Sequence, residues 1–285
     1  MTIIISGLAL RLYPSNAKQC SAMKNLTLLY PTDLSDFSRT NLQRLLPVIR
    51  SGNNRLILLH AGSHTKSQVE HDRVRIKEAF AEFCAALPEL KDLDYETRWE
   101  FGISSEVILN ESDKVEVDMV IMATHGAKGW EQFWGSKTQA VVQRSITPVL
   151  VVPEGASLVE TQTIVLAADY EDELSENKLY PLKLMADHLK TEIDIVTINR
   201  KESELSRPEK RNRKALRNQL RQWPHRFSHH FEEEIHEGLI KYAEKQNAGL
   251  IAVIPKTYGF LEKLFTESIS QKMVYQSTIP LLILV

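Results

Sequence analysis

Short apolar runs alternate along this chain with longer segments in which apolar residues recur every three or four positions. Three of the runs are LTLLY at 26–30, LILLH at 56–60 and MVIM at 119–122. Such runs are typical of strands buried on both faces of a parallel sheet, and the periodic segments are typical of amphipathic helices. This alternation predicts a doubly wound α/β domain. In this first part we expect strands at 26–30, 56–60, 95–101, 119–122 and 149–152, and helices at 37–50, 66–87, 105–114 and from 136 onwards.

The order of elements repeats after Pro153. SKTQAVVQRSITP at 136–148 aligns without gaps with SISQKMVYQSTIP at 268–280, a constant offset of 132 residues from Ser136 to Ser268. A constant offset indicates a tandem repeat. We therefore expect two α/β domains, at 23–153 and 163–285, joined by the turn-rich and polar linker PEGASLVETQ. Residues 1–22 precede the first domain, and we expect them to be an upstream mis-start or a loosely packed tail.

The segment that joins the fourth predicted strand to the next helix has a composition suited to phosphate binding. Gly126 and Gly135 lie in this loop, and the helix opens at Ser136. Glycine lets backbone come close to a ligand, and the N-terminus of a helix presents free N–H groups and the positive end of its dipole. A few glycines before a helix also occur in ordinary β-loop-α turns. The pattern alone leaves both interpretations open.

Composition narrows the class of protein. The charged fraction is 25% and the net charge is −2, so there is no global attraction to nucleic acid. Only two cysteines are present, with no CxxC pair, which excludes a disulfide framework or zinc site and fits a reducing cytoplasm. No apolar run approaches the roughly 18 residues that span a membrane. Although residues 207–221 carry seven basic side chains, we expect a solvated helix face there rather than a nucleic-acid site.

Three stretches resemble the universal stress protein family. They are LLYPTDLSDFS at 28–38, LILLHA at 56–61, and MATHG, GS and TPVLVV between 122 and 152. The resemblance covers nearly all of the first domain, whereas the second domain is similar mainly in its last helix and strand. It implies that the chain is a tandem of two such domains. Each would have a five-stranded parallel sheet in the order 3-2-1-4-5, and one branch of the family binds ATP or another adenine nucleotide.

The family's nucleotide signature is matched with two departures. The signature is G-x-x-G, nine residues, and then G-[ST]. Here Ala123 takes the place of the first glycine, and the spacer at 127–134 has eight residues. An alanine methyl would push back a group that lies on the backbone, and a shorter spacer would shift the phosphate loop.

The resemblance also implies which residues contact the nucleotide. In the order 3-2-1-4-5 the first and fourth strands are neighbours at the switch point, so Asp33 and Gly126 would face one crevice. Asp33 would lie beside the nucleoside, the Ala61 backbone at the adenine edge, and Gly126, Gly135 and Ser136 at the phosphates. The nucleotide would bind with or without Mg²⁺, and we expect no metal ligand from the protein. The full expected set is Pro31, Thr32, Asp33, Ala61, Met122, Ala123, His125, Gly126, Gly135, Ser136 and Lys137.

The second domain lacks the phosphate loop. Glu267 stands where the first domain has Gly135, and its carboxylate would repel a phosphate. We therefore expect this half to be a structural partner. Family members pair through their last strands, so Val149–Val152 and Leu281–Val285 would pair within one chain. Such pairing would form a pseudo-dimer and cover two exposed sheet edges, and a further homodimer of chains remains open.

These observations predict a cytoplasmic regulatory module that binds an adenine nucleotide in its first half, rather than a dedicated enzyme. A nucleotide-free scaffold is one alternative, because of Ala123 and the short spacer. An ATP-using enzyme of the related α/β superfamily is another, although it would need an SGGxDS-like loop where residues 31–38 read PTDLSDFS. Slow hydrolysis is conceivable if Thr124, His125 and Asp33 converge on a phosphate and a water, but no general base is evident.

Overall fold

A computed structural model gives the fold of this chain. It describes residues 25–51, 54–62, 69–124, 136–159, 161–200, 204–254 and 279–285. The predicted extension at 1–22, the loop at 125–135 and the last predicted helix of the second domain lie outside the described residues.

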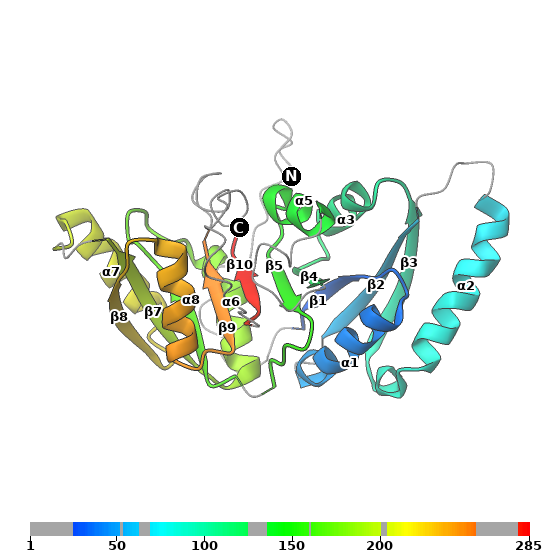
Figure 1. Cartoon of the computed structure of the whole chain (residues 1–285), viewed down its shortest axis with the longest axis horizontal. Helices are drawn as coiled ribbons and strands as arrows, with labels where there is room; N and C mark the ends of the chain where they lie inside the picture. The colour runs from blue at the N-terminus through cyan, green and yellow to red at the C-terminus, as the bar shows by residue number, and fades with distance from the viewer. Residues whose placement is uncertain are drawn as a thin grey trace, which may run out of the picture.

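Ten strands form one sheet across the described residues, and the two halves lie side by side along it (Figure 1). The sheet order is β3-β2-β1-β4-β5-β10-β9-β6-β7-β8. Read from either outer edge, each half has the order 3-2-1-4-5, which confirms the predicted topology. The strands are β1 Thr27–Pro31, β2 Arg55–Gly62, β3 Asp94–Phe101, β4 Met119–Thr124, β5 Val149–Pro153, β6 Thr163–Ala167, β7 Glu192–Asn199, β8 His225–Phe231, β9 Leu250–Val253 and β10 Leu281–Ile283.

The two halves join through their last strands. β5 and β10 are antiparallel, with Leu281 opposite Val151 and Leu282 opposite Leu150, whereas the pairs within each half are parallel. Leu282 is fully buried and Val151 is nearly so. The predicted pairing of the last strands is confirmed, although β10 ends at Ile283 rather than at Val285. Each strand covers an edge that the other half would expose.

Helices cover both faces of the sheet (Figure 1). Alternate residues of the strands point to opposite faces, so neighbouring Leu29 and Tyr30 belong to two different hydrophobic clusters. Tyr30 packs in the cluster with α1, α2, α6 and α7, and Leu29 in the cluster with α3, α5 and α8. None of the described helices is long and apolar enough to cross a membrane. The helices are α1 Asp36–Ser51, α2 Val69–Ala85, α3 Ser104–Ser112, α5 Ser136–Arg144, α6 Glu176–Leu189, α7 Arg207–Gln219 and α8 Ile235–Lys245, with a 3₁₀ helix, η2, at Pro88–Asp92.

Most element boundaries agree with the predicted ones to within two or three residues. The long helix predicted at 66–87 is α2, which ends two residues early, at Ala85. Leu87 is extended and Pro88 opens η2. A residue before proline avoids the helical conformation, so the helix stops ahead of Pro88 and the apolar periodicity continues through a different element.

Candidate functional site

The loop that follows β1 holds Asp33 in a rigid turn. The Asp33 carboxylate accepts hydrogen bonds from the backbone N–H of Ser35 at 3.0 Å and from its hydroxyl at 2.6 Å. Leu34 has a φ of 63°, a left-handed conformation that costs a branched side chain free energy. Thr32 accepts hydrogen bonds from the Leu34 N–H at 2.9 Å and from the Ser38 hydroxyl at 2.8 Å. The exposed Asp33 is therefore fixed in direction by its own loop.

Asp33 lies within electrostatic reach of the N-terminus of α5. Partial burial by itself raises the pKa of Asp33, but the hydrogen bonds from Ser35 and the positive charge of Lys137 outweigh it, so the pKa lies below its ordinary value. Lys137 is the second residue of α5, next to Ser136, and both are exposed. The structure thus brings Asp33 and Lys137, two residues far apart in the sequence, to one side of the switch point between β1 and β4.

The end of β2 is tied to the same loop. Pro31, the last residue of β1, pairs with β2, and the half-buried Ala61 follows near the end of that strand. His60 Nδ1 lies 3.0 Å from the Thr32 carbonyl oxygen, which can only accept, so this ring nitrogen is the donor. The His60 ring packs edge-on against Phe80. No role for His60 was predictable from the sequence, because a single polar residue at the end of an apolar strand carries no recognisable signal.

The carboxyl end of β4 contributes one buried polar group. Met122 is buried in the core on the α3 and α5 face, and Ala123 packs against the core on the other face. The Thr124 side chain is 3% exposed, and its hydroxyl has no hydrogen-bond partner among the residues that the structure describes. Its carbonyl accepts from the N–H of Glu154 at 3.0 Å. The side chain of Met122 is therefore a core residue, while Thr124 carries a hydroxyl at the end of the strand.

The predicted phosphate loop lies outside the described residues. His125, Gly126 and Gly135 belong to it, so their predicted contacts stay predictions. Ser136 and Lys137 are the first residues after it that the structure describes.

Metal binding finds no support in the part of the chain that is described. No group of three or more His, Cys, Asp or Glu side chains there could hold a metal ion. In the histidine-rich strand β8, His229 is exposed, whereas His230 packs against the ring of Tyr242 at 5.7 Å between centroids.

Comparison with known proteins identifies the first half. Residues 25–153 match the model of the universal stress protein family. The first half of the chain is a universal stress protein domain. No curated protein matches the chain in sequence.

Solved structures show how far the universal stress protein fold extends along the chain. A universal stress protein from Archaeoglobus fulgidus is 16% identical, with a TM-score of 0.69, over 92% of this chain and 96% of that one. The cytoplasmic domain of a prokaryotic cation chloride cotransporter is 11% identical, with a TM-score of 0.51, over 91% of this chain and 95% of that one. At these identities the likeness shows a shared fold, which covers both halves.

The second half repeats the turn that holds the aspartate in the universal stress protein domain. Asp169 follows β6 as Asp33 follows β1, and its carboxylate accepts from the N–H of Glu171 at 3.1 Å. Tyr170 has a φ of 61°, as Leu34 has one of 63°. The residues after the two aspartates differ, Leu34 in one half and Tyr170 in the other, yet both adopt the same left-handed conformation. This shared backbone geometry supports the duplication.

Proposed function

We propose that the first half binds ATP or another adenine nucleotide in the crevice at the carboxyl ends of β1 and β4. The observation that carries this proposal is the fold at the switch point: β1 and β4 are neighbours, Asp33 follows β1, and Lys137 in the first turn of α5 lies near enough to help lower the pKa of Asp33. Open α/β sheets bind ligands at this position, between neighbouring strands whose connections run in opposite directions. Membership of residues 25–153 in the universal stress protein family supports it.

The two charged groups suit opposite ends of a nucleotide. In the proposed complex, Lys137, Ser136 and the free N–H groups at the start of α5 bind phosphate oxygens, since both the ammonium and the helix dipole favour an anion. The Asp33 carboxylate accepts a hydrogen bond from a ribose hydroxyl. The proposal also assigns the Ala61 backbone to the adenine edge.

The other predicted contacts complete the proposed site. Pro31 and Thr32 border the nucleoside through their backbone, as Met122 and Ala123 do on the side of β4. His125, Gly126 and Gly135 belong to the phosphate loop. The buried hydroxyl of Thr124 adds a donor next to that loop.

We propose a binding module rather than a dedicated enzyme, acting in a cytoplasmic stress response. A general base near neutral pH needs a pKa close to the working pH. The lowered pKa of Asp33 makes it a weak base, and both hydrogen bonds from Ser35 occupy its oxygen Oδ1. This environment favours holding a nucleotide over activating a water molecule.

Titration calorimetry with ATP on the intact protein tests the proposal. We expect Lys137→Ala to weaken ATP binding by about tenfold or more, since a hydrogen bond to a charged group contributes about 1.5–3 kcal/mol. Lys210→Ala is a matched control, because Lys210 is an exposed lysine in the first turn of α7 in the other half. It should leave the affinity unchanged.

The proposal is wrong if millimolar ATP and ADP give no heat of binding and the denatured protein releases no adenine nucleotide. Equal losses in Lys137→Ala and Lys210→Ala would contradict the assigned position of the phosphates.

A further inference from the structure

One face of α7 carries a row of basic side chains. Arg207, Arg211, Lys214 and Asn218 follow one another at intervals of four, three and four residues. Residues at these intervals lie above one another on the same face of a helix. Arg221 continues the row in the turn after α7, where its N–H donates to the Asn218 carbonyl at 3.4 Å. Arg207, Arg211, Lys214 and Arg221 together form a basic row.

The side chains of the basic row have no partner in the described part of the chain. All four residues are exposed, and none of their side chains forms a hydrogen bond, an ion pair or a ring contact with a described residue. The neighbouring cations differ. Lys210 lies 3.6 Å from the Glu204 carboxylate. Arg213 and Arg217 hold their guanidinium groups over the ring of Phe227, at 4.8 and 4.9 Å from its centroid.

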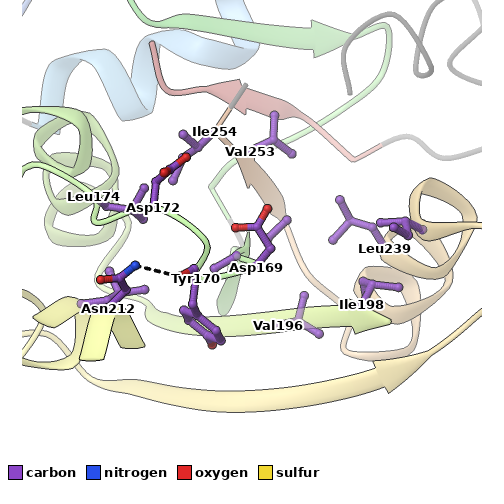
Figure 2. A pocket seen from close by; sticks show the side chains of 14 residues that line it. Asp169, Tyr170, Asp172, Leu174, Val196, Ile198, Asn212, Leu239, Val253 and Ile254 are labelled. Atoms are coloured by element: carbon purple, nitrogen blue, oxygen red, sulfur yellow. Dashed lines mark hydrogen bonds between the residues drawn. The ribbon is translucent and has the colours of Figure 1, made fainter. Parts of the chain in front are cut away.

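The inner face of α7 is packed against the second half. Leu216 and Leu220 are buried in the core. The buried Asn212 donates from its side-chain nitrogen to the Tyr170 carbonyl at 2.9 Å (Figure 2) and to the Glu171 carbonyl at 3.1 Å. These contacts fix the rotation of the helix about its own axis. The basic row therefore stays on the outer face, and the acidic loop that holds Tyr170 and Glu171 lies against the inner one.

The basic row gives one end of the molecule a charge opposite to that of the whole chain. Residues 207–221 contain seven basic side chains and one acidic one, Glu209, whereas the chain has a net charge of −2. The Glu209 carboxylate accepts from the Ser206 N–H at 2.6 Å in the cap of α7. α7 and the edge strand β8 lie at the end of the molecule away from the first half (Figure 1). This local excess of positive charge attracts an anionic partner to that end.

The spacing of the basic row suits the phosphates of a DNA duplex. At about 1.5 Å per residue, the row from Arg207 to Asn218 is about 17 Å long. This length matches about five base pairs at roughly 3.4 Å each. Three of the four cations are arginines, whose planar guanidinium groups donate parallel hydrogen bonds to a phosphate. The Asn218 amide adds a donor of a kind that contacts the DNA backbone.

The surface around the basic row disfavours other anionic partners. A helix that lies in a membrane surface needs apolar side chains beside its cations. The exposed large apolar side chains of the described ranges all lie outside residues 207–221. A protein partner needs an aromatic or aliphatic anchor, and a single nucleic-acid strand needs exposed rings on which its bases stack. A duplex backbone needs only cations and hydrogen-bond donors, which are what this face offers.

From the unpartnered basic row and its regular spacing, we propose that the outer face of α7 binds the phosphate backbone of duplex DNA. Each of the four cations contacts one phosphate. Backbone contacts carry no sequence information, so the binding is independent of DNA sequence. This role goes beyond the solvated helix face that the sequence predicted, and it is independent of the nucleotide proposed for the first half.

Fluorescence anisotropy of a labelled DNA duplex, titrated with the intact protein at several salt concentrations, tests this proposal. Four phosphate contacts release counterions, so a plot of the logarithm of the association constant against that of the salt concentration should have a slope of about −3 to −4. Affinity should then fall by roughly 100-fold between about 50 and 200 mM salt. Two duplexes of unrelated sequence should bind within about twofold of each other. No binding at low salt, a slope near zero or a strong sequence preference would overturn the proposal.

Replacement of the basic row locates the binding surface. The variant Arg207→Gln/Arg211→Gln/Lys214→Gln/Arg221→Gln should bind the duplex about tenfold more weakly or worse, and Lys214→Gln alone should reduce the salt slope by about one. The matched control removes four exposed cations from other parts of the surface, as Arg75→Gln/Lys77→Gln/Lys91→Gln/Lys245→Gln. It should keep the affinity within about threefold.

Circular dichroism spectra and melting temperatures should be the same for both variants and the wild type, because the replaced side chains have no partner in the described part of the chain. Equal losses of affinity in the two fourfold variants would overturn the assignment, since net charge alone would then explain the binding. An unchanged slope in Lys214→Gln would also contradict it.

Two competitors distinguish the class of partner. Vesicles of phosphatidylcholine and phosphatidylserine present an anionic lipid surface, and polyglutamate presents an acidic peptide. At an equal concentration of negative charge, we expect each to displace the labelled duplex about tenfold less effectively than unlabelled duplex does. Competition by either one that equals or exceeds that of the duplex would overturn the proposal.

Discussion

Asp194 shows how this fold accommodates a charge in its interior. The residue lies on β7 and is completely buried. Its carboxylate accepts hydrogen bonds from the Ser228 hydroxyl at 2.7 Å and the Tyr242 hydroxyl at 2.7 Å. Arg226 forms an ion pair with it at 2.8 Å. Burial, first of all, and the Asp194 carboxylate raise the pKa of Tyr242, which therefore stays protonated as a donor. A buried charge with three donors is tolerated, whereas a buried charge that loses its partners is not.

Removing Asp194 should destabilise the protein strongly. Asp194→Ala leaves the hydroxyl groups of Ser228 and Tyr242 without their acceptor and removes one of the two acidic partners of Arg226, and we expect the free energy of unfolding to fall by about 2–4 kcal/mol. Glu192→Ala is a matched control, since Glu192 pairs with the same Arg226 but lies on the surface with a side chain 38% exposed. An exposed pair contributes about 1 kcal/mol or less. Urea denaturation measures both values, and equal losses would contradict this account of the network.

At the scale of elements, the helix caps follow local rules. α7 begins with a capping box in which the Ser206 hydroxyl accepts from the Glu209 N–H at 3.4 Å and the Glu209 carboxylate accepts from the Ser206 N–H at 2.6 Å. Pro208 lies within the first turn, where a missing N–H costs nothing. Because α7 carries the buried Leu216 into the core, its first turn supports the packing of the second half.

Loss of this cap should cost a modest amount of stability. We expect Ser206→Ala to lower the free energy of unfolding by about 1 kcal/mol, since an N-cap serine satisfies an N–H that has no partner in the helix. Ser51→Ala is the comparison, because the Ser51 hydroxyl donates to the Val48 carbonyl at the other end of a helix and caps no free N–H. Chemical denaturation of both variants measures the difference. A cost for Ser206→Ala no larger than that for Ser51→Ala would argue against the cap.

The elements were predictable where one local signal decided them. Apolar runs such as 56–60 identify buried strands because no other element buries both faces of so short a segment. A serine directly before a helix is a local N-cap signal, and the hydroxyl of Ser35 accepts from the N–H of Ser38 at the start of α1. The bond from His60 to Thr32 was not predictable, because it joins two strand ends whose distance depends on tertiary packing.

At the scale of the whole molecule, the two halves share their architecture but differ in the charges near the switch point of each sheet. The antiparallel pair of β5 and β10 makes one sheet from two similar halves, and strained turns at Leu34 and Tyr170 recur in both. Around these shared features the charges differ. The first half has Lys137 near Asp33, whereas the second half carries the acidic loop 169–173 after β6. We therefore expect the crevice at the switch point to take an anion in the first half and to exclude it from the second.

Native mass spectrometry of the intact chain in the presence of ATP measures how many nucleotides each chain binds. We predict a single bound nucleotide per chain, because only the first half combines a positive helix N-terminus with Lys137. Chains that carry two nucleotides, or chains that carry none at millimolar ATP, would contradict the account.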